Sequence, residues 1–522
     1  MTLNSGDKIF IYGPPGSGKS ATGRQLAGAL GLPFYDLDEE IEARSRATIP
    51  ELFQREGEAG FRRRERKILA KFLDGTGVVA LGGGALLDPR NRIGAEAAGH
   101  VICLSAQVDD LVERLLADVE ERPLLAGDLH SRLSELMEHR AAHYGSFPLQ
   151  VDTSGLSADD TAWEAQVRLG MFHVRGMGSG YDVRVLPGGL DCAGVMLAQQ
   201  RLKGPVAVVS DENVAALYAE KVCISLEAAG YASRLVPIPA GEQHKTLQTV
   251  SALWEAFLDA GLERSSTVLA LGGGVTGDLA GFASATYLRG VAWVAAPTSL
   301  LGMVDASLGG KTGADLPRGK NLVGVFHPPR LVLADTATLA SLPEAEMRSG
   351  LAEVVKAGVI GDEVLFHRCA AGWKTVMGDL EALVRRSMAV KVKLIQEDPY
   401  EKGRRAALNL GHTIGHALEA GSGYRLRHGE AVAIGMVAAA RLSERLGIAQ
   451  RGLADEIAAA LQGLGLPVGA PPGMDWETIV QGMQVDKKRL SGALQFTLPE
   501  CIGKVRVGVE VTDAGLIRSV MF

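Results

Sequence analysis

Residues 407–436 read ALNLGHTIGHALEAGSGYRLRHGEAVAIGM, which sets polar side chains capable of binding metal inside an apolar helical pattern. The polar positions recur at steps of three, four and three residues, and they are Asn409, His412, His416 and Glu419. On a helix this spacing places them along one face. Two histidines four residues apart are typical of a zinc site, and a third, His428, follows a glycine-rich turn. Histidines that are only hydrogen-bonded in a core are the alternative.

Length and composition predict a multidomain protein of ordinary character. A chain of 522 residues is too long for one core, so we expect about two to four domains. The net charge of -7 gives no electrostatic footprint for nucleic acid. No apolar run approaches the ~20 residues of a membrane span, and the first residues lack a secretory pattern. We therefore expect neither a nucleic-acid partner nor a membrane.

The cysteines favour a reducing compartment. The chain has five, widely separated and without a CxxC pair. Neither a disulfide framework nor a thiolate zinc site is indicated. A cytoplasmic location follows as an expectation.

The first part of the chain contains a phosphate-binding loop. An apolar strand candidate at 8–12 leads into GPPGSGKS at 13–20, and a helical pattern follows at 21–30. In this context glycines let backbone N–H groups surround phosphates, Lys19 neutralises charge and the Ser20 hydroxyl can hold magnesium. The sequence therefore predicts an ATP-binding domain.

The segments that follow bear on which substrate accepts the phosphoryl group of ATP. FYDLD at 34–38 ends a strand with two carboxylates, FRRRE at 61–65 lies in a helix rich in arginine, and GGG at 82–84 follows a buried strand. Arg122 stands in a polar loop, and Arg140 and Tyr144 lie on the next helix. Carboxylates suit magnesium and a substrate hydroxyl, whereas arginine can bind an anion through two hydrogen bonds.

In this order the motifs make residues 1–169 similar to shikimate kinase. The resemblance implies a parallel-sheet fold of the nucleoside-monophosphate-kinase type, with ATP, magnesium and shikimate as ligands. The residues that it implies for ATP are Gly13, Gly16, Ser17, Gly18, Lys19, Ser20, Ala21 and Arg122, and for magnesium Ser20 and Asp36. Those that it implies for shikimate are Asp38, Arg62, Gly83, Gly84 and Arg140, with Lys19, Asp38 and Arg122 catalytic. A gluconate or nucleoside monophosphate kinase shares the phosphate loop but not this combination.

A glycine-rich connector, GMFHVRGMGSG at 170–180, has little to pack and predicts a domain boundary near residue 175. We expect domains at 1–170, 181–335 and 336–522, with a linker at 171–180. After it, short apolar strands alternate with helical stretches, which predicts an α/β domain. GGGVTGDLAGF at 272–282 suits a pyrophosphate at a helix N-terminus. The segment 297–329 lacks periodicity and is expected to be an active-site loop.

Beyond Asp335 the pattern is predominantly helical. In RSGLAEVVKAGVI at 348–360, Glu353 and Lys356 lie three residues apart on one helical face. A simple ion pair along the helix is one interpretation. One glutamate together with two histidines is also the ligand set of a catalytic zinc with an open fourth position.

Residues 181–522 resemble 3-dehydroquinate synthase, through GGGVTGDLAGF, DASLGGKTG, GKNLVG, FHPP, LAEVVKAG and NLGHTIGHALE in family order. The resemblance implies an α/β NAD-binding domain followed by an all-α metal-binding domain. The metal, zinc or cobalt, is assigned to Glu353, His412 and His428, so that His416 becomes a substrate contact. For NAD it implies Asp211, Asn213, Glu242, Lys245, Gly273, Gly274, Asp278, Thr298, Ser299, Asp305, Lys311 and Lys320.

The residues that the resemblance implies for substrate binding are Arg289, Asp305, Lys311, Asn321, Lys356, Lys391, Arg405, Asn409, His416 and Lys487. Of these, the residues expected to be catalytic are Lys311, Lys356, Lys391, Arg405 and His416. The implied reaction converts 3-deoxy-D-arabino-heptulosonate 7-phosphate (below, the heptulosonate phosphate) to 3-dehydroquinate and phosphate, with NAD recycled. A homodimer through this part is also expected. A polyol dehydrogenase, a related sugar-phosphate cyclase or a degenerate binding module are the alternatives.

Overall fold

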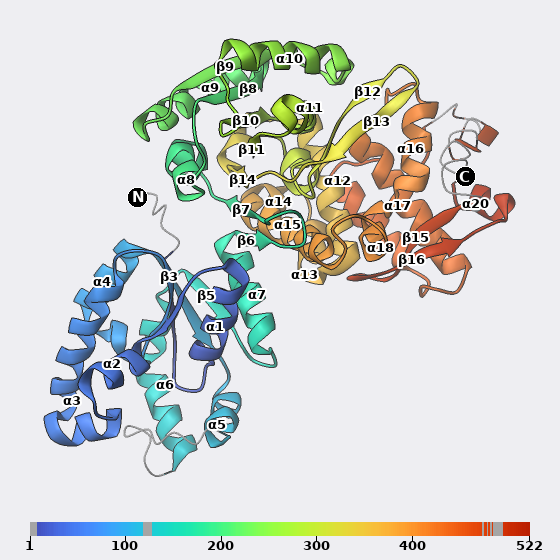
Figure 1. Ribbon diagram of the computed structural model, residues 1–522. Coiled ribbons are helices and arrows are strands. Elements are labelled where there is room, and N and C mark those ends of the chain that lie inside the picture. Colours follow the sequence, from blue (N-terminus) through green and yellow to red (C-terminus); the bar gives the residue numbers. More distant parts are fainter. Residues whose placement is uncertain are drawn as a thin grey trace. The chain divides into compact units, whose positions relative to one another are not determined.

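The computed structural model describes residues 8–117, 128–471 and 494–521, together with positions 474, 476, 477, 479, 480 and 483. The chain divides into two compact units, Met1–His173 and Val174–Phe522 (Figure 1). Two predicted site residues, Arg122 and Lys487, lie outside the described residues.

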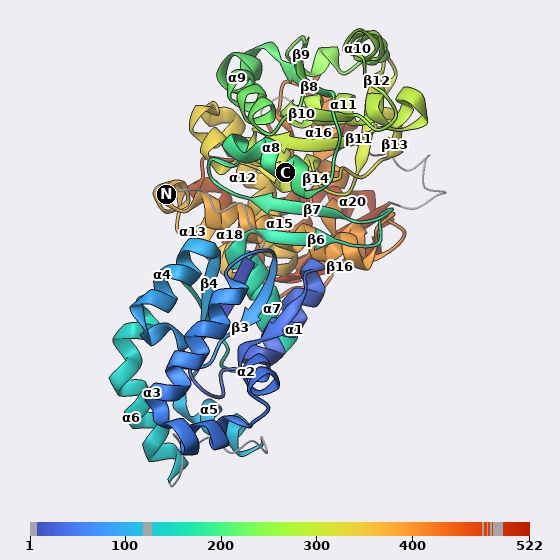
Figure 2. The same ribbon diagram turned by 60° about the vertical axis from the view of Figure 1, so that its left-hand side comes forward.

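The first unit is a parallel five-stranded sheet of order β2-β3-β1-β4-β5 with helices on both faces (Figure 1, Figure 2). Its strands are β1 (Lys8–Tyr12), β2 (Phe34–Asp36), β3 (Gly77–Ala80), β4 (His100–Ser105) and β5 (Leu149–Asp152). Its helices are α1 (Lys19–Leu30), α2 (Leu37–Ser45), α3 (Ile49–Leu69), α4 (Pro89–Ala98), α5 (Val108–Leu116), α6 (Leu129–Gly145) and α7 (Ala158–Leu169).

The central strand β1 is apolar throughout because both of its faces are covered. Ile9 and Ile11 pack into the core that α1 and α7 close, and Phe10 and Tyr12 into the core lined by α2, α3 and α6. Such continuous apolar strands are typical of parallel sheets buried on both sides. The loop after β1 therefore opens at the carboxyl edge of the sheet, next to the loop after β3.

The second unit begins with a parallel sheet in which the strands follow the order β7-β14-β11-β10-β8-β9. These strands are β7 (Tyr181–Val185), β8 (Val206–Asp211), β9 (Ser233–Ile238), β10 (Thr267–Gly272), β11 (Ala292–Pro297) and β14 (Leu331–Ala334). The helices between them are α8 (Ala193–Gln199), α9 (Glu212–Ala228), α10 (Leu247–Asp259) and α11 (Gly274–Thr286). The sheet carries the alternating α/β pattern that the sequence predicts.

Two segments differ from the sequence predictions. Residues predicted as a linker include strand β6 (Met171–Val174), and Phe172 and Met177 are fully buried, so the expectation of little packing there was wrong. The predicted loop at 297–329 contains a hairpin of β12 (Lys311–Leu316) and β13 (Gly319–Phe326). Glycines hide its strand periodicity, because Gly313 and Gly324 lie opposite each other where side chains would overlap the neighbouring backbone.

The rest of the unit is mainly helical. Its helices are α12 (Glu344–Gly361), α13 (Glu363–Ala370), α14 (Trp373–Gly378), α15 (Leu380–Glu397), α16 (His412–Gly421), α17 (His428–Arg445), α18 (Leu453–Gly463) and α20 (Ala514–Met521). It also contains one antiparallel hairpin that the sequence analysis did not predict, β15 (Gln495–Cys501) with β16 (Lys504–Glu510). Each helix in the described part of the chain is too short or too polar to cross a membrane.

Helix α16 is shorter than the polar stripe predicts. Asn409 ends the 3-10 helix η9 (Arg404–Asn409), and Gly411 at φ 79° separates it from His412, where α16 begins. The helix therefore carries only His412, His416 and Glu419 of the stripe. The left-handed conformation of Gly411 breaks the expected continuous helix.

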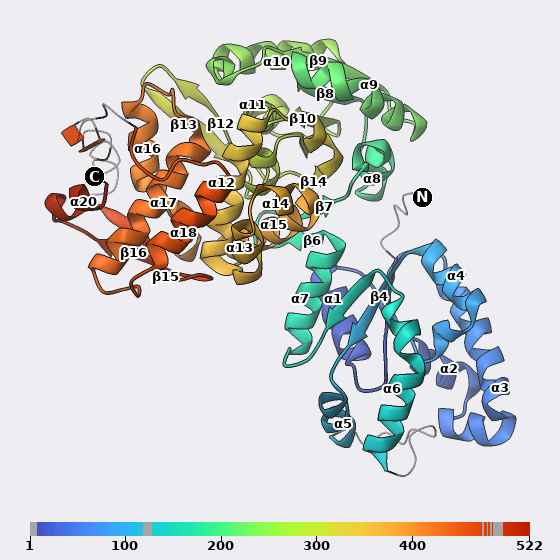
Figure 3. The ribbon, with the colours of Figure 1, turned by 180° about the vertical axis from the view of Figure 1, so that it is seen from behind.

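Glycines let α17 approach both α16 and α12, which lie beside it (Figure 3). A Cβ atom at Gly435 would overlap the carbonyl oxygen of Gly411, and one at Gly429 would overlap that of Ser349 on α12. These contacts set the spacing of the three helices. Thirteen residues of α17 are buried, so the helix has no room to shift.

We expect Gly435→Ala to destabilise the second unit by about 1–3 kcal/mol, because the added methyl group meets backbone that cannot rotate away. Gly378→Ala on α14 is the matched control, since a Cβ there meets nothing within 4 Å and should change stability by less than about 0.5 kcal/mol. Urea unfolding of the full chain, followed by circular dichroism, measures both. Equal stability of the two variants would contradict the close approach.

Candidate functional site

The loop after β1 is shaped to surround an anion. Gly13 and Gly18 take φ angles of 142° and 82°, and a Cβ at Gly13 would lie 2.5 Å from the carbonyl oxygen of Leu104. Gly18 is the N-cap of α1, so the first N–H groups of that helix and its positive dipole end lie at the loop. Lys19 Nζ donates to the Pro14 carbonyl at 2.9 Å, which places its charge at the same loop.

The predicted magnesium ligands lie together. The Ser20 hydroxyl donates to Asp36 Oδ2. The other carboxylate oxygen of Asp36 accepts the backbone N–H of Asp38 at 3.0 Å and so caps α2. A hydroxyl and a carboxylate beside a phosphate loop are the oxygen ligands that Mg²⁺ prefers.

The glycine loop after β3 is held in place by hydrogen bonds to the carbonyl oxygen of Gly83. Gly83 O accepts three hydrogen bonds, from Arg140 Nη1 at 3.1 Å, Tyr144 OH at 2.8 Å and Tyr12 OH at 3.3 Å. A Cβ at Gly84 would lie 2.5 Å from Arg62 Nη2. Both predicted arginines therefore converge on this loop. The sequence analysis did not find the role of Tyr12, because its strand position reads as core.

Glu65 was part of the FRRRE motif but received no predicted role. Its side chain is 1% exposed and accepts Arg62 Nη1 at 2.8 Å, while Oε1 has no hydrogen-bond partner among the described residues. Burial raises the pKa of Glu65 to about 7, although the Arg62 charge opposes this shift. Asp38 is near it, since a Cβ at Gly82 would meet both carboxylates.

In the second unit the loops after β8, β10 and β11 meet at one edge of the sheet. Asp211 caps α9 by accepting the backbone N–H groups of Asn213 and Val214, each at 3.1 Å. Thr298 N donates to Gly272 O at 3.0 Å, and α11 begins directly after Gly273. The free N–H groups of α11 suit a pyrophosphate.

Several predicted NAD contacts are paired with one another. Lys245 is buried, and its Nζ lies 2.6 Å from Asp278 Oδ2 and 2.6 Å from Asn321 Oδ1. Lys320, in the hairpin, lies 3.4 Å from Glu242. The hairpin thus joins the glycine loop and the loop after β9 into one polar group of side chains.

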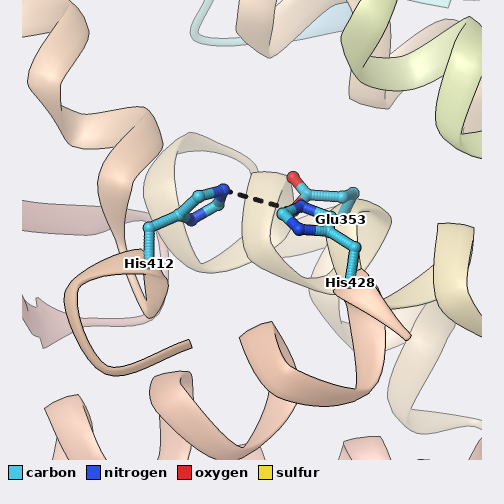
Figure 4. Close-up of side chains that lie close together, drawn as sticks. All are labelled: Glu353, His412 and His428. Atoms are coloured by element: carbon cyan, nitrogen blue, oxygen red, sulfur yellow. Dashed lines mark ion pairs between the residues drawn. The ribbon is translucent and has the colours of Figure 1, made fainter. Parts of the chain in front are cut away.

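The predicted metal ligands come together from three helices (Figure 4). Glu353 of α12 lies between His412 at the start of α16 and His428 at the start of α17. Its Oε1 is 3.8 Å from His412 Nε2 and 3.4 Å from His428 Nε2. One ligand atom from each residue lies within 4.8 Å of the others, so a single ion can contact all three.

The donor set fits zinc or cobalt. Glu353 is 3% exposed, Lys356 pairs with its Oε2, and its buried Oε1 has no hydrogen-bond partner in the part of the chain that the structure describes. A buried carboxylate oxygen without a donor is costly unless a cation meets it. Two imidazoles and one carboxylate are a known catalytic zinc set.

Electrostatics keep the carboxylate ionised. Burial opposes the charge of Glu353, but Lys356 and the two histidines outweigh it and hold its pKa well below the usual range. Burial likewise lowers the pKa of His428, yet Glu353 and Glu419 raise it to about 10. Without metal, Glu353 is therefore ionised and His428 carries a proton, which a bound cation would displace.

Lys356 and Lys391 lie close to this cluster, and further cationic side chains are paired in the same unit. Lys391 pairs with Asp305, whose carboxylate stays ionised because the Lys391 charge outweighs burial and lowers its pKa. Arg405 is 1% exposed, and a Cβ at Gly309 would overlap its guanidinium. Lys311 pairs with Glu401, for which no role was predicted from sequence.

Five predicted substrate contacts are exposed rather than buried: Arg289, Lys311, Asn321, Asn409 and His416. His416 and Asn409 lie at the surface, although the His416 ring is 5.1 Å from that of His412. Arg289 is exposed at the end of the turn η6 (Tyr287–Arg289) and has no ion-pair partner among the described residues. The geometry thus brings the metal ligands and lysines together, but not Arg289.

Known protein families match both units of the chain. The family model for shikimate kinase matches residues 15–168. The models for the N-terminal and C-terminal parts of 3-dehydroquinate synthase match residues 235–349 and 350–489. A 3-dehydroquinate synthase from Synechococcus sp. is 45% identical over 345 residues, which cover 64% of this chain and 94% of that relative.

Solved structures of sugar-phosphate cyclases share the fold of the second unit. A 2-deoxy-scyllo-inosose synthase complexed with carbaglucose-6-phosphate, NAD+ and Co2+ is 27% identical, with a TM-score of 0.62 over 67% of this chain and 99% of its own. A 2-epi-5-epi-valiolone synthase from Streptomyces hygroscopicus subsp. jinggangensis, with NAD+ and Zn2+ bound, is 29% identical, with a TM-score of 0.61 over 66% and 96%. Identity is higher to the dehydroquinate synthases than to these cyclases. The chain therefore belongs to the 3-dehydroquinate synthase family and joins to that enzyme a shikimate kinase, so that it is bifunctional.

Proposed function

We propose that the first unit phosphorylates shikimate through the residues gathered around the loops after β1 and β3. The N–H groups of 13–20 and Lys19 hold the ATP phosphates, and Ser20 and Asp36 hold magnesium. Asp38 accepts the proton of the attacking hydroxyl. The observation that supports these roles is that the phosphate loop, Asp36 and the Gly83 loop lie at the carboxyl ends of the neighbouring strands β1, β2 and β3.

The shikimate carboxylate is bound by Arg62 and Arg140. Arg62 lies against Gly84, and Arg140 donates to Gly83 O, so both guanidinium groups point at one loop. Ionised Glu65 holds Arg62 by a charge-assisted hydrogen bond and so fixes the direction of its remaining donors. Substrate affinity therefore depends on the protonation of Glu65.

In the second unit we assign a divalent metal to Glu353, His412 and His428, and NAD to the edge of the sheet at Asp211 and Gly273. When bound, the metal supplies a Lewis acid at the substrate hydroxyl, and NAD takes up and returns a hydride. The observation that carries this assignment is the buried Oε1 of Glu353, which faces two histidines and has no hydrogen-bond partner among the described residues. Because the net reaction is redox-neutral, no NADH accumulates.

The side chains around the metal ligands bind and orient the heptulosonate phosphate. Lys356 neutralises the far oxygen of Glu353 and leaves its near oxygen to the metal. Lys391, Arg405 and Lys311 supply positive charge for the substrate phosphate, which leaves by elimination. Asp305 and Glu401, paired with Lys391 and Lys311, hold these ammonium groups in place.

We also propose a cytoplasmic location and a homodimer through the second unit. All five cysteines are free, which fits a reducing compartment. Leu217 and Ile224 are each 59% exposed and lie seven residues apart on α9, so they share a face of that helix. An exposed apolar face of this kind suits a contact between two copies.

Glu65→Gln should abolish the pH dependence of shikimate binding. With a pKa of about 7 the wild-type carboxyl ionises as the pH rises from 6 to 8 and then holds Arg62, so the KM for shikimate should fall roughly fivefold, for about 1 kcal/mol. Because its pKa is raised in the folded state, protonated Glu65 stabilises the fold, and this stability is lost as the pH rises from about 4.5 to about 7. Steady-state kinetics from about pH 6 to 8 and urea unfolding from about pH 4.5 to 8 measure the two effects.

Glu58→Gln is the control for Glu65→Gln, since Glu58 also lies near Arg62, at 3.4 Å, but its side chain is 55% exposed. This variant should retain the wild-type profile. A Glu65→Gln profile as steep as that of the wild type would refute the role of Glu65.

Arg140→Ala should raise the KM for shikimate roughly ten- to a hundredfold, because a charge-assisted hydrogen bond contributes about 1.5–3 kcal/mol. The KM for ATP should change little. Arg132→Ala on the same helix is the control, as that side chain is 59% exposed and pairs only with Glu135 among the described residues. An unchanged shikimate KM in Arg140→Ala would count against the assignment.

The two activities should be separable in the full chain. Lys19→Ala should abolish ADP formation with shikimate and leave phosphate release from the heptulosonate phosphate unchanged, and His412→Ala should do the reverse. Stripping zinc or cobalt with a chelator should likewise stop phosphate release alone, and either metal should restore it. If one substitution disables both reactions, or if metal-free enzyme still releases phosphate, the assignment is wrong.

A further inference from the structure

A second carboxylate faces His428 from the side away from Glu353. Glu419 of α16 is buried, and its Oε2 lies 3.4 Å from His428 Nδ1. His428 Nε2 lies 3.4 Å from Glu353 Oε1. The two ring nitrogens of His428 are thus divided between two carboxylates.

The contact between Glu419 and Nδ1 indicates that His428 binds metal through Nε2. An imidazole binds metal through a nitrogen that carries no proton, and the other nitrogen then carries the N–H. With Glu419 accepting at Nδ1, the Nε2 lone pair points to Glu353 and His412. The carboxylate also makes the imidazole a more basic ligand.

His412 is held in the same way by a weaker acceptor. Its Nδ1 lies 3.2 Å from the carbonyl oxygen of Leu410, so its Nε2 likewise faces Glu353. Leu410 precedes α16, and Glu419 lies seven residues after His412, two turns along the same face. The segment 410–419 therefore orients both histidines, one through a backbone carbonyl and the other through a charge.

A competing interpretation makes Glu419 a metal ligand itself. His416, Glu419 and His428 also offer ligand atoms within 4.8 Å of one another. That set would use His428 Nδ1 and leave the buried Oε1 of Glu353 without a partner, and its third member, His416, is exposed. In the set of Glu353, His412 and His428 no member is exposed, and an ion bound there would meet the buried Oε1 of Glu353.

We propose that Glu419 is a positioning residue that orients His428 and fixes its tautomer, and so strengthens divalent metal binding without contacting the ion. The inference rests on the proposed metal site. Residues that orient a metal-bound histidine commonly change metal affinity by about 10–100-fold when they are replaced.

The test measures metal affinity of the full chain without substrate or NAD. Metal-free wild type, Glu419→Ala and Glu419→Gln are titrated with Co2+ and Zn2+ in competition with a chromogenic chelator, and the cobalt absorption bands are recorded. Glu419→Ala should bind about 10–100-fold more weakly, with altered bands. Glu419→Gln should fall between it and the wild type, since its amide oxygen accepts the hydrogen bond without the charge.

Glu346→Gln is the matched control, because Glu346 lies on the same helix as Glu353, pairs with Arg427 beside His428, and is 52% exposed. It should bind within twofold of the wild type. Thermal unfolding of the metal-free variants separates lost affinity from lost folding, and Glu419→Gln keeps the size of the side chain should Glu419→Ala fail to fold.

Two further results would overturn the inference. Affinity within twofold of the wild type in both Glu419 variants would show that the carboxylate does not position His428. Two equivalents of Co2+ in the wild type and one in Glu419→Ala would make Glu419 a ligand. His412→Ala distinguishes a wrong metal site from a wrong role for Glu419. If His412→Ala binds Co2+ like the wild type, the proposed metal site is wrong. If His412→Ala loses Co2+ binding while both Glu419 variants bind like the wild type, only the role of Glu419 is refuted.

Discussion

The buried carboxylate of Glu353 is the constraint on which the helical part of the second unit depends. An ion removed from water costs several kcal/mol unless charge and hydrogen bonds compensate. Lys356, one turn further along α12, compensates one oxygen, and the other lies 3.8 Å from His412 Nε2 and 3.4 Å from His428 Nε2. A bound dication completes this arrangement, so folding and metal binding are expected to support each other.

Close helix packing makes that arrangement possible. Glu353 and His428 come from α12 and α17, which touch through Gly429, and His412 comes from α16, which α17 meets at Gly435. Any side chain at these glycines would separate the ligands. The first unit uses the same principle at a sheet edge, where Gly84 lies against the guanidinium of Arg62. In both units a glycine lets rigid backbone approach a charged side chain, and that side chain is the one proposed to bind the ligand.

Much of this could be predicted from sequence, because motifs are local and their spacing reflects geometry. The phosphate loop, the GGG turns and the pairing of Glu353 with two histidines are examples. What the sequence analysis missed depends on contacts between distant segments. Glycines hide the hairpin 311–326, the start of α16 at His412 depends on the left-handed φ of Gly411, and Glu419 acquires its role only when α17 folds back beside α16. Tyr12 reads as core until the Gly83 carbonyl is seen to accept its hydroxyl.

Each unit of the chain contains a site of its own. Each unit has its own sheet, its own buried core and its own polar cluster, and Glu353, His412 and His428 all lie within the second. The two reactions are not consecutive, since 3-dehydroquinate must lose water and then be reduced before it becomes shikimate. No intermediate can therefore pass directly from one site to the other. Coupling would require an element with two states that both sites bias, whereas the ion pairs of Glu65 with Arg62 and of Glu353 with Lys356 each join residues of one unit. Joining the two enzymes thus fixes their ratio at one to one, and the chemistry at each site is expected to proceed as it would in separate proteins.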